Sequence, residues 1–314
     1  MRILLTGAGG RVGAHLLPAL AAHGHEVTAL DRKADYPLPR GCRRIVTGLS
    51  EKSDFSRLLD RMDIVVHLAD GFNAHEHLPV SARPPLAWQQ ARATRALALA
   101  AAGNGICTIY LSTIKTMCAS SAREVLSEST AGQPQSLYGL LKLEAEETLR
   151  QAGRKHGTRV NILRFPIVFG AGIGGNMERL RRLLDSPLPL PLAGIDNRRS
   201  LISVESLVEA VCRLIHHGQD QGGTFVVHDG SMTTSALART IRTGLGRPAR
   251  LFRLPRPLWR AGETLPLARG IAGRLHGSLE IDDRVFRQRF SWRPGLPLEE
   301  RIGRWARLEA ARGG

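Results

Sequence analysis

The sequence predicts an α/β fold: a doubly wound parallel sheet with a smaller, discontinuous lobe in the C-terminal half. Strand-like and helix-like stretches alternate over about the first 230 residues, a pattern typical of a parallel sheet covered by helices on both faces. A glycine-rich turn joins the first apolar run to the first helical stretch, and the apolar pattern loosens after Gly170. The second lobe is therefore expected to be built from the later segments.

The individual elements follow from apolar periodicity and its breakers. Short apolar runs predict strands at Arg2–Thr6, Glu26–Leu30, Arg44–Thr47, Met62–Ala69, Ile106–Leu111, Arg159–Phe169 and Thr224–His228. Helical periodicity predicts helices at Val12–His23, Leu86–Ala102 and Leu137–Gln151. Pro18 lies inside the first helix and is expected to do no more than kink it. The chain from 246 to 314 is expected to mix short helices with proline turns.

These elements divide the chain into two units. Residues 1–170, together with about 197–230, are expected to form the main domain. Residues 171–196 and 231–314 are expected to form the lobe over the carboxyl edge of the sheet, which is where open α/β sheets bind their ligands.

Composition and charge narrow the function. Lysine and arginine number 44 against 28 acidic residues, a net charge of +16 that is concentrated in the last quarter of the chain. Such a field attracts phosphate-bearing partners. No nucleic-acid-binding motif accompanies it, so a phosphorylated small molecule is favoured over nucleic acid. The sequence contains no membrane-length apolar run, no signal-peptide pattern and no zinc-ligand spacing, and its four cysteines are scattered. We therefore expect a cytoplasmic protein with no membrane span and no metal.

The turn after the first strand predicts a dinucleotide site of the Rossmann type. Glycines at this point allow a tight turn, a close approach of pyrophosphate and close packing of helix on sheet, and the helix N-terminus favours the negative charge. Asp31 ends the second strand, where a carboxylate binds the adenosine ribose hydroxyls. This favours NAD, although Arg11 and Arg32 leave NADP open. The predicted cofactor-binding residues of these two segments are Gly7, Gly9, Gly10, Arg11, Val12, Gly13, Asp31 and Arg32.

A second constellation predicts acid–base chemistry. Tyr138 and Lys142 are four residues apart, on one face of a predicted helix. A tyrosine with its ordinary pKa of about 10 is a poor base at neutral pH, and a neighbouring ammonium is expected to lower that pKa. Thr113 ends a strand upstream, where its hydroxyl can orient a substrate oxygen. The predicted catalytic residues are therefore Thr113, Tyr138 and Lys142, and the latter two are also expected to contact the cofactor.

At this point the chain resembles the extended short-chain dehydrogenase/reductase family, the NAD-dependent epimerase/dehydratase group that acts on nucleotide sugars. TGAGGRVG, DIVVHLA, YLST, YGLLK and LRFPIVFGAG follow that family's order and spacing. The stretch from Gly174 to Ala210 looks most like the bacterial 4-keto-sugar-nucleotide reductases and 4-epimerases of surface-polysaccharide synthesis. The resemblance implies Leu68 and Ala69 at the cofactor, substrate contacts from Asn176, Arg199 and Lys115, and a homodimer.

Several activities remain open within this resemblance. We expect an NAD(P)-dependent reduction of the C4 ketone of a UDP-4-keto-6-deoxy (N-acetyl)hexose. The alternatives are a UDP-hexose 4-epimerase and a catalytically silent nucleotide-binding regulator. Ile114 and Lys115 stand where the dehydratases have Asp and Glu, so 4,6-dehydration is not expected.

The chain also departs from the family pattern near the cofactor. Leu49 stands where an acidic residue usually contacts the adenine, and Asp70 replaces a small residue. Ala91–Arg95 replaces an Asn-x-x-Gly-Thr pattern, and Met117-Cys118 stands where an aromatic residue or Asn followed by Gly is common. The sequence alone leaves open how these changes affect activity.

Overall fold

The computed structural model describes residues 1–118, 121–217, 222–254 and 277–313. Its main feature is a seven-stranded sheet in the order β3-β2-β1-β4-β5-β6-β9, in which every neighbouring pair is parallel. The predicted doubly wound sheet is thus confirmed. The strands are β1 (Arg2–Thr6), β2 (Glu26–Asp31), β3 (Arg43–Val46), β4 (Ile64–His67), β5 (Cys107–Thr113), β6 (Val160–Phe165) and β9 (Gly223–Val226).

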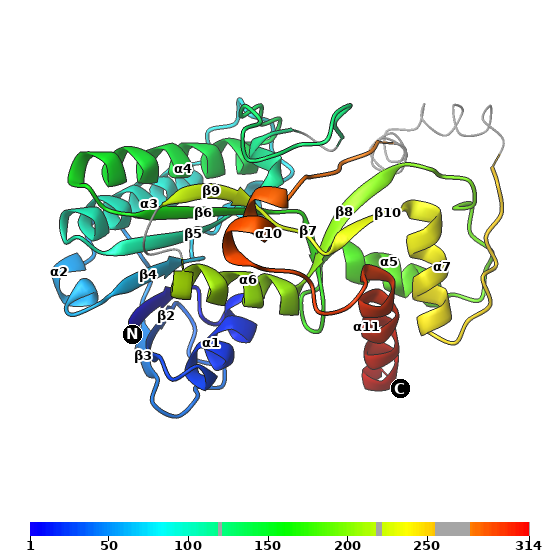
Figure 1. Ribbon diagram of the computed structural model, residues 1–314, viewed down its shortest axis with the longest axis horizontal. Coiled ribbons are helices and arrows are strands. Elements are labelled where there is room, and N and C mark those ends of the chain that lie inside the picture. Colours follow the sequence, from blue (N-terminus) through cyan, green and yellow to red (C-terminus); the bar gives the residue numbers. More distant parts are fainter. Residues whose placement is uncertain (119–120, 218–221, 255–276, 314) are drawn as a thin grey trace.

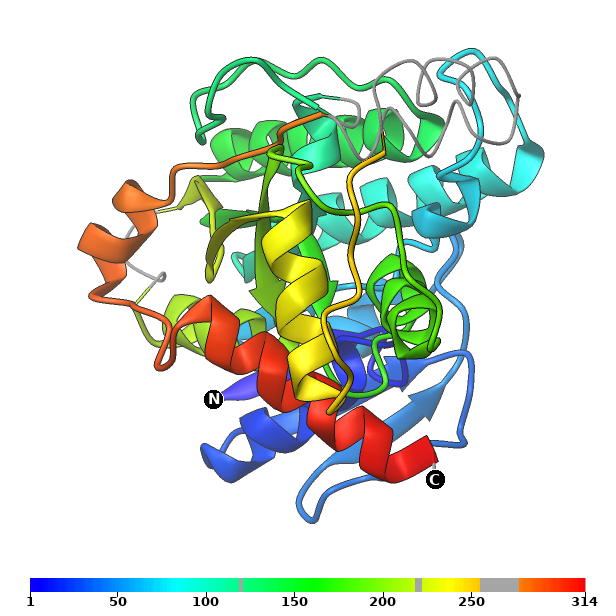
Figure 2. The ribbon, with the colours of Figure 1, turned by 90° about the vertical axis from the view of Figure 1, so that its right-hand side faces the viewer.

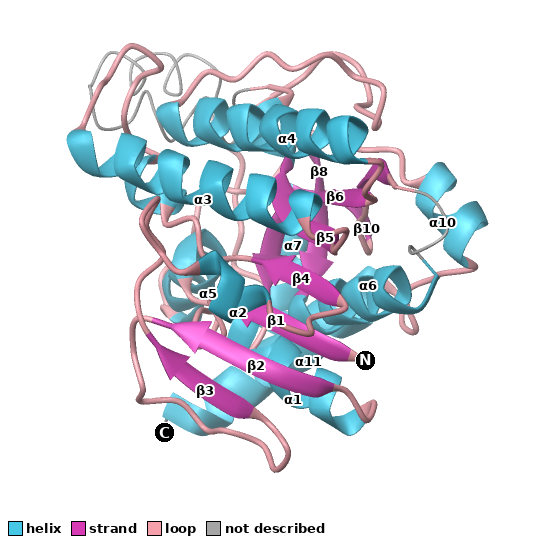
Figure 3. Cartoon of the chain, turned by 90° about the vertical axis from the view of Figure 1, so that its left-hand side faces the viewer, coloured by secondary structure: helices cyan, strands magenta, loops and turns pink. Residues whose placement is uncertain are grey.

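Helices cover both faces of this sheet. In Figure 1, α3 and α4 lie above it, and α1 and α6 lie below it; Figure 3 shows the same layers from the side of β3. The described helices and 3-10 turns are α1 (Gly13–Ala22), α2 (Phe55–Leu59), η1 (Phe72–His75), α3 (Pro85–Gly103), η2 (Ile114–Thr116), α4 (Leu137–His156), α5 (Gly175–Asp185), α6 (Val204–His217), α7 (Thr234–Gly244), α10 (Arg284–Phe290) and α11 (Leu298–Gly313).

A second, three-stranded sheet was not expected. Its order is β10-β8-β7, with β7 (Ile167–Phe169) parallel to β8 (Arg198–Ser203) and β10 (Gly230–Thr233) antiparallel to it. The single strand predicted over Arg159–Phe169 is therefore wrong. The chain leaves the large sheet after Phe165 and enters the small one at Ile167. Pro166 stands at the change, where it cannot donate a ladder hydrogen bond.

The small sheet packs with α5, α7 and α11. Figure 2 shows α7 and α11 side by side in front of the main domain. Their shared core contains Phe169, Leu201, Ile241 and Trp305, so the first strand of the small sheet and the last helix of the chain share one apolar cluster. The lobe boundaries at 171–196 and 231–314 stay a prediction, and residues 255–276 and 314 of that segment lie outside the described residues.

The helix that carries the tyrosine–lysine pair is longer than predicted. It begins after Ser136, whose hydroxyl accepts a hydrogen bond from the Gly139 N–H at 3.2 Å, as an N-cap does. It ends at Gly157, whose φ of 65° stops the helix in the left-handed conformation. The predicted end at Gln151 is thus too early. Within the described residues, no helix is long and apolar enough to cross a membrane.

Candidate active site

The glycine-rich turn is shaped by backbone contacts that exclude side chains. Gly7 has a φ of 74°, which favours glycine. A Cβ added to Gly13 would stand 2.1 Å from the Gly7 carbonyl oxygen, and one added to Gly10 would stand 3.0 Å from that oxygen. The first turn of α1 therefore packs directly on the end of β1. The cradle in front of the helix start fits the pyrophosphate of a dinucleotide.

Asp31 lies beside this turn at the end of β2. Its carboxylate accepts hydrogen bonds from the backbone N–H of Gly9 at 3.1 Å and of Lys33 at 3.0 Å. Tyr36, which sequence reasoning missed, packs against the same glycine: a Cβ on Gly9 would stand 2.6 Å from the Tyr36 ring. The Arg44 guanidinium lies over that ring at 4.7 Å from its centroid. A carboxylate that accepts hydrogen bonds from ribose hydroxyls fits the adenosine half of NAD.

The other predicted cofactor residues surround the same turn. The N–H groups of Leu68 and Ala69 both donate to the Thr6 hydroxyl at 3.2 Å, which joins the ends of β1 and β4. Val12 packs against the main core. Arg32 is exposed, with its aliphatic stem facing Gly48. Arg11 is also exposed, and its guanidinium reaches Gly175 at the start of α5.

Two of the three predicted catalytic groups meet directly. The Thr113 side chain reaches the Tyr138 hydroxyl and favours its ionised form, although the two residues come from β5 and α4. Thr113 Oγ1 also accepts a hydrogen bond from the Lys115 N–H at 3.3 Å, which caps the short turn η2. This geometry presents two adjacent hydroxyl groups at the carboxyl edge of the sheet.

Lys142 is held by other groups. Its Nζ lies 2.5 Å from Asp70 Oδ2 and 2.5 Å from the Leu111 carbonyl oxygen, and 4.6 Å from the centroid of the Tyr110 ring. The ammonium thus already has a carboxylate partner. The sequence marked Asp70 as unusual, but only the structure reveals this pairing.

The expected effect of Lys142 on Tyr138 is therefore wrong for this structure. The pKa of Tyr138 is raised well above its ordinary value. Burial is the largest cause, the Asp70 charge raises the pKa further, and the hydrogen bond from Thr113 offsets part of the rise. Burial and the Asp70 charge thus both favour the protonated phenol.

The three predicted substrate residues come from three different elements, β8, η2 and α5. Arg199 is half-buried on β8, and Lys115 on η2 forms an ion pair with Glu76. The charges of Arg199 and Lys115 both reach Cys118 and favour its thiolate, although burial dominates and raises the pKa of that thiol. Asn176 is exposed in the first turn of α5. The structure thus gathers Arg199 and Lys115 near one buried cysteine.

Two departures from the family pattern have structural partners. Leu49 packs against the apolar cluster that contains Leu4 and Leu30, so this position contributes to the core instead of offering an adenine contact. Thr94, in the run Ala91–Arg95 on α3, is buried and hydrogen-bonded to His67 Nε2 at 3.2 Å. The Leu49 and Thr94 side chains thus both contribute to the packing of the main domain.

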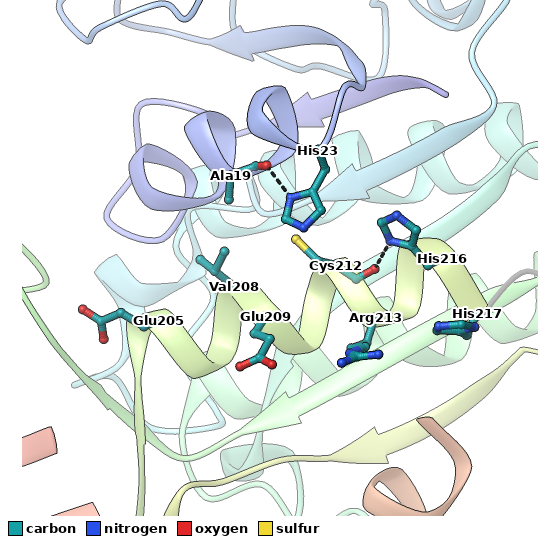
Figure 4. A pocket seen from close by; sticks show the side chains of 9 residues that line it. All are labelled: Ala19, His23, Glu205, Val208, Glu209, Cys212, Arg213, His216 and His217. Atoms are coloured by element: carbon teal, nitrogen blue, oxygen red, sulfur yellow. Dashed lines mark hydrogen bonds between the residues drawn. The ribbon is translucent and has the colours of Figure 1, made fainter. Parts of the chain in front are cut away.

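A separate pocket lies between α1 and α6. Its volume is about 410 Å³, and Figure 4 shows His23 from α1 facing Cys212 and His216 of α6 across it. The predicted site residues are absent from its lining: Ala19, His23, Glu205, Val208, Glu209, Cys212, Arg213, His216 and His217. The pocket is therefore distinct from the dinucleotide and tyrosine sites.

Known proteins resemble this chain over most of its length. The model of the NAD dependent epimerase/dehydratase family matches residues 3–227. A UDP-glucose 4-epimerase of Vibrio cholerae is 29% identical over 95% of this chain and 92% of its own length. A dTDP-4-dehydro-6-deoxy-D-allose reductase of Streptomyces bikiniensis is 30% identical over 85% of this chain and 88% of its own.

Solved structures share the fold at lower identity. A UDP-glucuronic acid 4-epimerase from Bacillus cereus, solved with UDP-glucuronic acid and NAD, has a TM-score of 0.77 at 19% identity and covers 100% of both chains. A UDP-glucose 4-epimerase from Thermotoga maritima, solved with UDP-glucose, has a TM-score of 0.76 at 20% identity over 100% of this chain and 99% of its own. With a family model spanning most of its length, a cradle that fits a dinucleotide and paired threonine and tyrosine hydroxyls, the chain belongs to the NAD dependent epimerase/dehydratase family and is an NAD-dependent enzyme of the extended short-chain dehydrogenase/reductase type.

Proposed function

We propose that the protein reduces the C4 ketone of a UDP-linked 4-keto-6-deoxy (N-acetyl)hexose, in the supply of precursors for polysaccharide or O-antigen synthesis. The observation that carries this proposal is the state of Tyr138. Its hydroxyl is hydrogen-bonded to Thr113, and its pKa is raised by burial and by Asp70. With the Thr113 hydroxyl beside it, the phenol can bond to a carbonyl oxygen and give it a proton, which is what ketone reduction requires.

The cofactor would lie along the carboxyl edge of the sheet. The glycine turn would hold its pyrophosphate, Asp31 its adenosine ribose, and Leu68 and Ala69 would line it beside β4. When bound, the reduced nicotinamide supplies the hydride for the sugar C4. NAD fits the Asp31 carboxylate better than NADP does, because that carboxylate repels a 2′-phosphate.

The chain's own groups would handle the substrate oxygen. The Thr113 and Tyr138 hydroxyls would both bond to the C4 oxygen, and Tyr138 would transfer its proton as negative charge develops there. Lys142, whose ammonium charge is compensated by Asp70, would reach the cofactor ribose. Arg199 and Lys115 suit the diphosphate, since guanidinium and ammonium groups bind phosphate oxygens well; Asn176 would contact the same group.

A UDP-hexose 4-epimerase is the second candidate. It is favoured by the Vibrio cholerae relative, which matches nearly the whole chain. An epimerase must first remove a proton from an alcohol and must retain its cofactor through the cycle. Leu49 offers no carboxylate to the adenine and packs into the core instead, which favours a cofactor that exchanges. A silent nucleotide-binding regulator is less favoured, because the Thr–Tyr–Lys set is complete.

The test is a substrate panel with two cofactors. NADH or NADPH oxidation is followed with UDP- and dTDP-linked 4-keto-6-deoxyhexoses, with Tyr138→Phe as the control. We expect stoichiometric consumption of reduced cofactor, and purified protein that carries little bound NAD. Interconversion of UDP-glucose and UDP-galactose without added cofactor would instead establish the epimerase. The homodimer and the cytoplasmic location expected from the sequence stay predictions, and gel filtration tests the first.

A further inference from the structure

The charge of Lys142 is compensated inside the protein before any ligand binds. The Lys142 side chain is 6% exposed and the Asp70 side chain 2%. Their 2.5 Å ion pair is completed by the Leu111 carbonyl oxygen, which accepts a second hydrogen bond from the same ammonium. A buried ion pair of this kind is costly to break, because each charge left alone would be desolvated.

Asp70 is itself fixed from two sides. Tyr110, on β5, donates its hydroxyl hydrogen to Asp70 Oδ2 at 2.9 Å, and the Phe72 N–H donates to Oδ1 at 3.2 Å. The carboxylate therefore cannot swing away from Lys142 without losing both bonds. The Asp70 charge acts on the Tyr110 hydroxyl in the same direction as on Tyr138: burial first, and then Asp70, raise the Tyr110 pKa.

The other charged groups near the Tyr138 phenol are also paired. Lys115 lies 5.9 Å from the centroid of the Tyr138 ring but forms an ion pair with Glu76. Glu76 and Asp70 both disfavour the phenolate, while Thr113 favours it through its hydrogen bond. Lys142 and Lys115 thus each have a carboxylate partner: Asp70 from the chain after β4 for Lys142, and Glu76 from the end of η1 for Lys115.

We propose that Asp70 is a positioning residue: by holding the Lys142 ammonium in a buried ion pair, it prevents that charge from promoting ionisation of Tyr138 and so specialises the site for proton delivery. This inference rests on the proton-donor role proposed above for Tyr138. It extends that role by naming the residue that sets it. Asp70 acts through Lys142 and through its own charge, without contact with the substrate.

The direct test measures tyrosine ionisation without turnover. The chain has three tyrosines, so tyrosinate absorbance is titrated in pairs of proteins that differ only by Tyr138→Phe, and the difference isolates Tyr138. In the native background we expect ionisation above the ordinary pKa of about 10. In the Asp70→Asn background we expect it to move to lower pH by about one unit or more, the effect of an uncompensated nearby ammonium.

The controls separate this effect from general damage. Asp63, directly before β4, has an exposed carboxylate that pairs with Arg2. Asp63→Asn removes this carboxylate and should leave the Tyr138 ionisation unchanged. Asp70→Glu should restore most of the native value. If Tyr138 ionised at the same pH in the Asp70→Asn background as in the native background, the proposal would be overturned. Native Tyr138 ionising below about pH 9 would overturn it too, a measurement that needs only the native chain and Tyr138→Phe.

Activity adds a second readout that separates the two proposals. If the protein reduces a ketone, the alkaline limb of its pH–rate profile should move to lower pH in Asp70→Asn by the same amount as the ionisation. A shifted ionisation with no ketone reduced by native protein would leave the role of Asp70 standing and reject the proposed substrate. A shifted rate profile with an unshifted ionisation would reject the role of Asp70.

Discussion

The Asp31 carboxylate accepts a 3.1 Å hydrogen bond from the backbone N–H of Gly9 and so ties the end of β2 to the glycine turn after β1. The same carboxylate bonds the Lys33 N–H. Asp31 thus orders the glycine turn, and in the proposed binding mode its negative charge also faces the adenosine ribose. Substitutions at this position can separate them.

Asp31→Ala should weaken NAD binding by about 1–3 kcal/mol, the worth of a charge-assisted hydrogen bond, and should reduce the discrimination against NADP. Asp31→Asn keeps an acceptor for Gly9 but not the charge, so it should relax the NADP discrimination with a smaller loss of NAD affinity. Calorimetric titration with both cofactors measures this. Asp35→Ala, an exposed acidic residue nearby, is the control. Unchanged NAD affinity in Asp31→Ala would remove this residue from the site.

Tyr138→Phe should lower turnover by roughly 10²–10⁴-fold, the usual contribution of a general acid, and leave NAD affinity within error. The substitution deletes the hydroxyl that bonds Thr113 and keeps the ring. Steady-state rates and cofactor titration are measured on the same preparation. Turnover within threefold of the native protein would point to a different proton donor.

Much of this site could be predicted because its signals are local. The glycine turn, the acid at the end of β2 and the i, i+4 tyrosine–lysine spacing each lie within one short segment. The state of Lys142 could not be predicted, because its partner Asp70 comes from the loop after β4, and only the packing of α4 on β5 and η1 brings them together. Spacing placed the lysine on the right helix face, but a distant carboxylate determines where its ammonium lies.

In the fold, too, the elements with local sequence signals could be predicted, and those that depend on distant contacts could not. The buried strands of the large sheet are apolar runs, which sequence patterns detect well. The small sheet is built from short polar segments such as RRSLIS and GSMT, whose pairing partners lie far along the chain. Such strands form because tertiary contacts complete them, so their own composition gives little signal.

Arg199→Ala should raise the KM for the nucleotide sugar by roughly 10-fold or more, as expected for lost hydrogen bonds from a charged group, and should change NAD affinity little. Arg198→Ala is the matched control, since Arg198 is an exposed neighbour on β8 that pairs with Glu280. Equal losses for both ligands in Arg199→Ala would indicate a disturbed fold rather than a lost substrate contact.

Gly13→Ala should destabilise the protein by about 1–3 kcal/mol, the usual cost of overpacking, because the new Cβ would stand 2.1 Å from the Gly7 carbonyl oxygen. Gly48→Ala provides the comparison: its Cβ would meet nothing closer than the Arg32 side chain at 3.5 Å, so its effect should stay within about 0.5 kcal/mol. Urea unfolding of the two variants measures both. Equal stability of the two would mean that α1 can move away from β1 without cost.

The last prediction concerns acid stability. His67 on β4 is 1% exposed and hydrogen-bonded to the hydroxyls of Thr6 and Thr94, and burial lowers its pKa from 6.5 to about 4. Between these values the unfolded chain binds a proton that folded His67 does not, so the free energy of unfolding falls as the pH drops from about 6.5 to about 4. The full contribution is about 3 kcal/mol.

His67→Gln removes this proton linkage along with the native hydrogen bonds. It should therefore be less stable than the native protein at pH 7, and the gap should shrink as the pH falls toward about 4. His77→Gln changes an exposed histidine after η1 and should parallel the native curve throughout. Urea unfolding at several pH values gives all three curves. A gap between native and His67→Gln that stays constant with pH would show that burial does not lower the pKa of His67, and this would contradict the prediction.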